Sequence, residues 1–162
     1  MYSVRRFATR HSRGFEIFYN AVEPVILAVM GGLSKLSGGR LDKPMTWAEK
    51  QTKGLLFDCK MCGNCVLSST GMTCPMNCPK TIRNGPCGGV RDNGHCEVKP
   101  EMKCVWVEAW DGASRMQGGD KIHTVQFATD KSKTGSSAWL NLLKQRELEA
   151  SQRSKESVPP TQ

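Results

Sequence analysis

Residues 59–104 read CKMCGNCVLSSTGMTCPMNCPKTIRNGPCGGVRDNGHCEVKPEMKC, and this stretch decides the fold. It contains all eight cysteines of the 162-residue chain, six of its glycines, and Pro75, Pro79 and Pro86. A segment so poor in helix and strand formers buries too little apolar surface to fold unaided. We therefore expect a cross-link, and the candidates are iron–sulfur clusters, zinc ions and disulfides.

Helical patterns lie on both sides of this Cys-rich segment (residues 59–104). The chain is therefore predicted to be a small metal-organised α+β domain, a mostly irregular cysteine-rich knot with flanking α-helices. We divide it into residues 1–45, a basic arm and an apolar docking helix, and residues 46–112, the metal-binding domain. Residues 113–162 then form an extended segment, an amphipathic helix and a disordered tail.

Residues 15–36 form the first predicted helix, which is apolar over most of its circumference. Pro24 should end or kink it near Glu23, and Gly31 and Gly32 should loosen its end. The unbroken apolar run, residues 24–30, is far shorter than the roughly 18 residues that a bilayer requires, so a membrane span is not expected. We expect this helix to dock on a partner, with internal core and membrane-surface contact as alternatives.

Three further segments have recognisable patterns. Thr46 and Glu49 have the spacing of a capping box and predict a helix that ends near Phe57. An apolar run at residues 105–110 is expected to pack beside the last cysteine, and residues 112–135 to be extended or looped. Ser137 should cap a final helix over residues 138–152, followed by a disordered tail from Ser151.

The net charge of +8 is concentrated in the first two thirds of the chain. Residues 1–58 hold nine Lys and Arg against five Asp and Glu, whereas residues 105–162 hold eight against seven. The arginines of the N-terminal arm, Arg5, Arg6, Arg10 and Arg13, should steer an acidic partner surface. Aromatic and basic residues do not alternate as they do on a nucleic-acid platform, so no nucleic-acid partner is expected.

No export signal is visible, and a reducing, cytoplasmic location favours metal over disulfides.

The first three cysteines, Cys59, Cys62 and Cys65, follow one another at a two-residue spacing. Structural zinc sites usually place two Cys-x2-Cys pairs a dozen or more residues apart. A third cysteine at the same spacing is typical of the ferredoxin loop, in which a fourth follows after three residues and precedes proline. Ser69 occupies that place here, and the Cys-Pro steps come later, at Cys74 and Cys78. The spacing therefore resembles a ferredoxin motif that has been stretched by an insertion.

Eight thiolates match two [4Fe-4S] clusters by count. Three alternatives remain: one [4Fe-4S] cluster with one zinc ion, zinc alone, and disulfides. His95 could replace a thiolate ligand, but we expect it at the surface of a turn. The predicted cofactor and metal ligands are Cys59, Cys62, Cys65, Cys74, Cys78, Cys87, Cys96 and Cys104. The chain has no dinucleotide fingerprint, no phosphate-binding loop and no barrel-length repeat of strands and helices, so we expect a non-catalytic accessory subunit without catalytic residues.

Residues 55–110 closely resemble the cysteine-rich C-terminal-type domain associated with methylenetetrahydrofolate reductases. The resemblance rests on LFDC at residues 56–59, TGMTCPMNCPK at 70–80, RNGPCGGV at 83–90, CEV at 96–98 and CVW at 104–106. It implies a small iron–sulfur subunit that delivers electrons to the flavin of a flavin- and folate-binding barrel in one-carbon metabolism. Methyltransferase components are further possible partners of that family.

We therefore expect an iron–sulfur electron-transfer subunit of a methylenetetrahydrofolate-reductase-like complex. The alternatives are a structural zinc-binding module that scaffolds the same barrel and a basic zinc-ribbon-like nucleic-acid binder.

Overall fold

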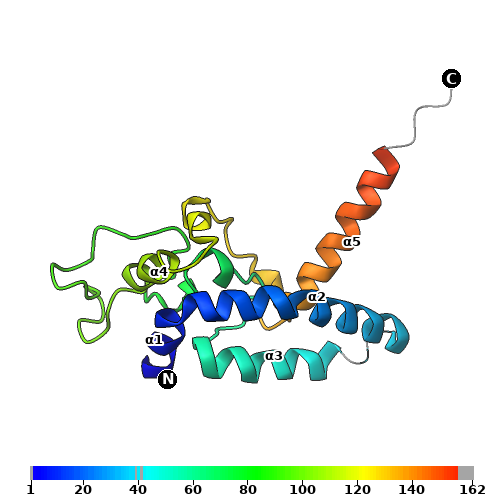
Figure 1. Ribbon diagram of the computed structural model, residues 1–162, viewed down its shortest axis with the longest axis horizontal. Coiled ribbons are helices and arrows are strands. Elements are labelled where there is room, and N and C mark those ends of the chain that lie inside the picture. Colours follow the sequence, from blue (N-terminus) through cyan, green and yellow to red (C-terminus); the bar gives the residue numbers. More distant parts are fainter. Residues whose placement is uncertain (1, 39, 41, 157–162) are drawn as a thin grey trace.

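The fold is mainly helical (Figure 1). The computed structural model describes residues 2–38, 40 and 42–156, with the backbone alone at 154–156. Its α-helices are α1 (Tyr2–Arg10), α2 (Ser12–Ser37), α3 (Asp42–Phe57), α4 (Val105–Ala113) and α5 (Ala138–Glu156). Short 3-10 turns span Leu67–Ser69, Pro75–Asn77, Gly119–His123 and Lys131–Lys133. In these described residues the β component that the sequence led us to expect amounts to two isolated bridges, Val90 with Cys96 and His95 with Lys103.

The predicted N-terminal arm is the helix α1, and one of its arginines is not available for steering a partner. Arg5 is buried, and its guanidinium lies 3.2 Å from the Glu108 carboxylate of α4. The steering role predicted for Arg5 is therefore wrong, because a carboxylate remote in sequence binds it. Arg6 lies 3.5 Å from the other oxygen of that carboxylate, and its side chain is partly exposed. Arg10 and Arg13 remain exposed.

The helix α2 continues through Pro24 and ends only at Gly38, so the break expected near Glu23 is absent. Gly38 adopts a left-handed conformation (φ 58°) and its N–H bonds the Ser34 carbonyl, which is a common way to end a helix. The middle of α2 contacts α5, where Arg146 lies 2.7 Å from the Glu23 carboxylate.

The N-terminal half of α2 is tied to the rest of the domain by two buried polar side chains. Both carboxylate oxygens of Glu16 accept hydrogen bonds from backbone N–H groups, 2.7 Å from Gln117 N and 2.8 Å from Gly118 N. Ser12 donates to the Gly112 carbonyl at 2.7 Å. These contacts join residues about a hundred positions apart, so α2 is part of the folded body of the domain.

By length and composition α2 is also a helix that could cross a membrane, contrary to the expectation from its short apolar run. Such a match near an N-terminus is weak evidence, because core helices and signal sequences share it. The buried contacts of Ser12 and Glu16 with the domain are those of a packed helix.

The helix α3 begins at Asp42, four residues before the predicted cap. The Thr46 hydroxyl bonds the Asp42 carbonyl at 2.7 Å from inside the helix, so its predicted role as N-cap is wrong. Pro44 is tolerated because the first helical turn makes no use of its missing N–H. The predicted end at Phe57 is confirmed.

The helix α4 packs against the Cys-rich segment through a close backbone approach. A Cβ atom on Gly71 would lie 2.1 Å from the Ala109 carbonyl oxygen, and one on Gly112 would lie 2.2 Å from the Gly71 carbonyl oxygen. Both positions therefore require glycine. Beside them, Trp106 is buried and donates its indole N–H to the Ile82 carbonyl at 3.0 Å, which confirms its predicted packing role.

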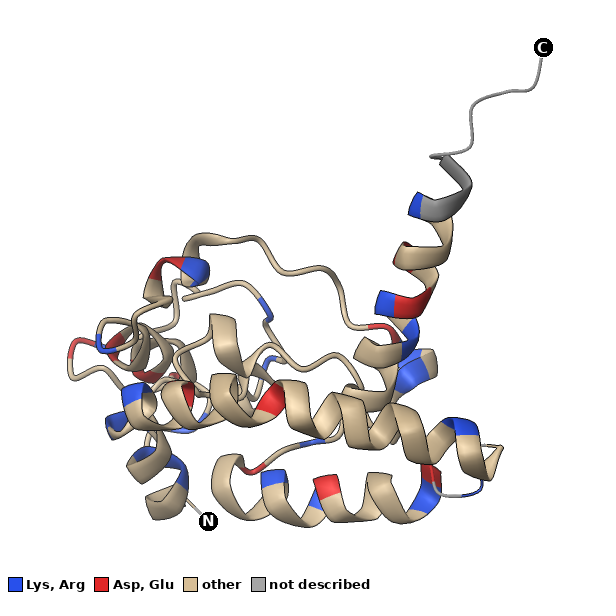
Figure 2. Ribbon diagram, turned by 45° about the vertical axis from the view of Figure 1, so that its right-hand side comes forward, with Lys and Arg blue, Asp and Glu red and all other residues tan. Residues whose placement is uncertain are grey.

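The helix α5 begins after Ser137, whose side chain accepts the Leu140 N–H at 3.2 Å, so the predicted cap is confirmed. The helix extends to Glu156 and projects away from the body (Figure 1). The tail expected from residue 151 is therefore helical to 156, and residues 157–162 lie outside the described part of the chain. In Figure 2 the basic and acidic residues are spread over helices and loops of the view, without one continuous basic face.

We predict that Glu16→Ala will lower the free energy of unfolding by about 2 kcal/mol, because two buried backbone N–H groups lose a charged acceptor. Thermal or denaturant unfolding measures the effect. Glu101→Ala, which removes an exposed carboxylate, is the control and should change stability by less than about 0.5 kcal/mol. Equal stability of the two variants would show that Glu16 does not anchor α2.

Candidate metal centre

The loop that carries the first three cysteines has an unusual backbone. Asp58, Met61 and Gly63 all adopt left-handed conformations, with φ of 51°, 48° and 73°. Such a conformation is costly for a residue with a side chain, and it occurs mostly where the surrounding structure fixes a functional loop. A Cβ on Gly63 would lie 2.3 Å from the Lys133 carbonyl oxygen, so the loop is also pressed against the segment that precedes α5.

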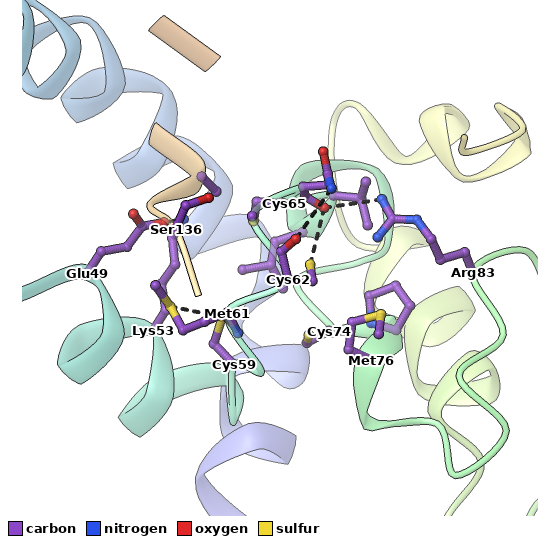
Figure 3. A pocket seen from close by; sticks show the side chains of 16 residues that line it. Glu49, Lys53, Cys59, Met61, Cys62, Cys65, Cys74, Met76, Arg83 and Ser136 are labelled. Carbon is purple, nitrogen blue, oxygen red and sulfur yellow. Dashed lines mark hydrogen bonds and ion pairs between the residues drawn. The ribbon is translucent and has the colours of Figure 1, made fainter. Parts of the chain in front are cut away.

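These reversals bring four thiols to one small cavity (Figure 3). Cys59, Cys62, Cys65 and Cys74 all line it, and its volume is about 20 Å³. The Met61 N–H points at the Cys59 sulfur at 3.3 Å. Backbone N–H groups aimed at sulfur are typical of loops that hold anionic metal–thiolate centres.

The four thiols differ in exposure. Burial raises the pKa of Cys74 to about 12 and also raises the pKa of Cys59, and the neighbouring cysteines add to both effects. Cys62 is half-buried, and Cys65 is the one cysteine in the chain classed as exposed. A thiol with a raised pKa is protonated in the metal-free chain and must lose its proton to bind metal.

A buried cation stands beside this cavity. Lys53 of α3 is 5% exposed, lines the cavity and lies 2.6 Å from the Glu49 carboxylate. Burial alone would lower the pKa of Lys53, but the Cys65 thiolate and Glu49 raise it to about 12. Its ammonium lies 4.3 Å from the centre of the Trp139 ring, and Ser137 donates a short hydrogen bond to Glu49. The charge pair therefore connects the thiol loop to both α3 and α5.

The other four cysteines lie along the remainder of the Cys-rich segment. Cys78, Cys96 and Cys104 are buried and Cys87 is half-buried. Cys87 is 3.9 Å from the Lys80 ammonium, which also pairs with Glu97. The Glu97 hydrogen bond, then the Cys87 and Cys96 thiolates, raise the pKa of Lys80. Cys87 therefore lies against this lysine, and the charge of Cys96 also acts on it.

The four thiols of the first group do not form a closed site for a metal ion. Among the described residues, no three His, Cys, Asp or Glu side chains converge closely enough to hold one. By their chemistry, four cysteine thiols are ligands that an iron–sulfur cluster or a zinc ion would use. The cavity that they line, at about 20 Å³, has the size of a single water site. His95 donates a hydrogen bond of 2.7 Å from its Nδ1 to the Pro100 carbonyl at the turn.

Residues 39–132, which contain all eight cysteines, match the family model described as methylene-tetrahydrofolate reductase C terminal. The chain belongs to this family. The match covers more than half of the chain and relates it to the reductases of folate metabolism. Neither the curated proteins nor the solved structures include a match to the chain.

Sequence reasoning found the cysteines of this family member but missed the charged residues behind them. Glu49 and Lys53 have the spacing of an ordinary surface pair on a helix, and Glu49 had been interpreted as part of a cap. Ser137 and Trp139, at the start of α5, lie against this pair. The single available signal was that Lys53 lies six residues before the first cysteine.

We predict that in metal-free protein a thiol-alkylating reagent at about pH 8 will modify Cys65 first and Cys74 last, since Cys65 is exposed and Cys74 is buried with a raised pKa. Peptide mass spectrometry over time gives the order. Loading with metal should protect Cys59, Cys62, Cys65 and Cys74 together. Unchanged labelling of any one of the four after loading would remove that residue from the ligand set.

Proposed function

We propose that this protein is the iron–sulfur electron-transfer subunit of a methylenetetrahydrofolate-reductase-type complex. The family relation supports association with a catalytic subunit of that type. We place the chain in a reducing compartment, the cytoplasm. All eight cysteines are free thiols, and a reducing compartment keeps thiols in this state. The chain itself would then carry electrons without binding folate.

One observation supports the redox assignment most strongly: three thiols at ferredoxin-like spacing line one cavity together with Cys74, and Lys53 lies beside it. Four thiolates in a low-dielectric setting repel one another, and a buried cation offsets part of that repulsion. In this proposal Cys59, Cys62, Cys65 and Cys74 hold one [4Fe-4S] cluster. Cys78, Cys87, Cys96 and Cys104 hold the second.

Bound clusters of this kind supply reversible one-electron transfer, at potentials set by their surroundings. The residues of this chain would tune and shield them. Lys53 and the Met61 N–H place positive charge near sulfur, and Trp106 lies in the buried cluster with Cys104, where it excludes water from the second group.

The exposed face of α2 is the proposed docking surface for the catalytic subunit. Phe18, Val25 and Val29 are 66%, 61% and 54% exposed, and Leu33 and Leu36 continue the same stripe at helical spacing. An uninterrupted apolar stripe on a small domain usually marks an interface. Leu27 and Met30, on the opposite side of α2, are buried within the chain, so only part of the predicted docking residues face outward.

We predict that anaerobically purified protein will contain about eight irons and eight acid-labile sulfides per chain. Cys62→Ser and Cys96→Ser should each lose about half of this iron, because they remove ligands from different clusters. Elemental analysis and the absorption spectrum of each variant provide the measurement. Protein that is colourless and holds zinc alone would overturn the electron-transfer function and favour a structural zinc module.

We predict that Val25→Asp will weaken binding to the catalytic subunit at least about tenfold and leave iron content unchanged, because a charge enters an apolar contact. Deleting residues 1–36 would also remove the docking surface. It would test docking less well than Val25→Asp, because it also removes the buried hydrogen bonds of Ser12 and Glu16 to the rest of the domain. Val98→Asp, at a residue 51% exposed outside α2, is the control. If Val25→Asp binds the catalytic subunit with full affinity, docking through α2 is contradicted. It is also contradicted if the unchanged chain binds anionic lipid vesicles and Val25→Asp abolishes only that binding.

A further inference from the structure

A second and larger cavity adjoins the thiol loop. It is a groove of about 730 Å³, enclosed by α2, the end of α3, the thiol loop, residues 126–128 and α5. Its size is within the range of clefts that accept a ligand or a peptide segment. The larger part of its wall is apolar.

The groove meets the thiol-lined cavity at Cys65. Lys53, Cys65 and Arg83 line both spaces, and Cys65 is the exposed member of the first thiol group. Whatever occupies the groove therefore contacts a ligand of the proposed cluster. Because electron transfer weakens steeply with distance, an occupant of the groove beside Cys65 would be well placed to exchange electrons with the first thiol group.

The walls of the groove combine aromatic rings with positive charge. Phe18 and Tyr19 of α2 face it, as do Phe127 and Trp139. Five basic residues and one acidic residue are among those that line it. The basic residues are Lys53, Arg83, Lys121, Lys133 and Arg146, and the acidic residue is Glu23. Glu49 neutralises Lys53, and Glu23 neutralises Arg146. Lys133 lies 3.9 Å from Asp130, which offsets part of its charge. The excess positive charge of the groove therefore comes mainly from Arg83 and Lys121.

Phe127 lines the groove and is 92% exposed. The Asn84 side chain makes two hydrogen bonds of 2.8 Å with the backbone of the preceding residue, Gln126. Arg83 also reaches Thr129 at 3.4 Å. These bonds anchor the chain on both sides of Phe127, and an exposed aromatic ring on such a segment is a typical anchor of a protein interface.

We propose that this groove receives an apolar segment with acidic flanks from the redox partner and is the surface through which electrons pass at Cys65. The inference rests on the proposed function and extends it, since it states which surface exchanges electrons and what chemistry binds there. Charge complementarity requires the acidic flanks, because the groove has a positive excess. The apolar stripe of α2 begins at the groove with Phe18 and Val22, so one partner surface can cover both.

The test uses the full chain and the methylenetetrahydrofolate-reductase-type catalytic subunit from the same organism. Phe127→Asp is compared with Val125→Asp, a matched control that is 78% exposed two residues earlier and does not line the groove. We expect Phe127→Asp to weaken binding at least about tenfold and Val125→Asp less than about threefold. Lys121→Glu should slow association and reduce its dependence on salt. Photocrosslinking supplies a readout independent of metal: p-benzoylphenylalanine in place of Phe127 should join the catalytic subunit, and in place of Val98 it should not.

The outcomes separate this inference from the function on which it rests. If Val25→Asp abolishes binding but Phe127→Asp and the crosslinker at 127 have no effect, the partner docks elsewhere and the groove inference fails alone. If neither variant affects binding while the protein contains iron, both docking assignments fail. A free nucleotide or flavin could also bind the isolated chain. If Phe127→Asp abolishes this binding and leaves binding of the catalytic subunit unchanged, the groove is a small-molecule site and the inference is overturned.

Discussion

Four thiols line one partly buried cavity, and the charge that they would carry as thiolates is the constraint around which this part of the structure is arranged. In a partly buried cavity such charges are unfavourable unless a cation and backbone N–H groups oppose them. Lys53 provides the cation, and it is itself buried and paired with Glu49. Breaking a buried pair by removing one partner is expensive, so the pair fixes the position of α3 against the thiol loop. The Ser137 bond to Glu49 then sets where α5 begins.

The same arrangement explains how a segment without sheet or large core keeps its shape. The Cys-rich segment is held from outside by helices, through the close approach of Gly71 to Gly112, the bond from the Trp106 indole to the Ile82 carbonyl and the contact between the Thr9 and Thr73 hydroxyls. Each of these contacts joins parts of the chain that are distant in sequence. Metal binding would add the remaining cross-links, as in other domains whose folding is coupled to their metal.

Local chemistry was readable from the sequence, and remote contacts were not. The Ser137 cap and the end of α3 at Phe57 were predicted because each depends on neighbours in the chain. The burial of Arg5 could not be predicted, since its partner Glu108 lies 103 residues away. The triplet of cysteines was evident from the sequence. Its position beside Cys74 depends on a left-handed backbone at Asp58 and Met61, and this conformation could not be predicted because neither residue is glycine. Spacing alone therefore predicted the candidate ligands without showing which four belong together.

The central claim is that this chain carries electrons to a catalytic subunit of the methylenetetrahydrofolate reductase type. Anaerobic rapid mixing of the chemically reduced chain with the oxidised flavin-containing subunit tests it most directly. The account predicts that the electron paramagnetic resonance signal of the reduced clusters will disappear as the flavin absorbance bleaches, at a rate that saturates with the concentration of the subunit. A reduced chain that binds the subunit and leaves its flavin oxidised would contradict the account.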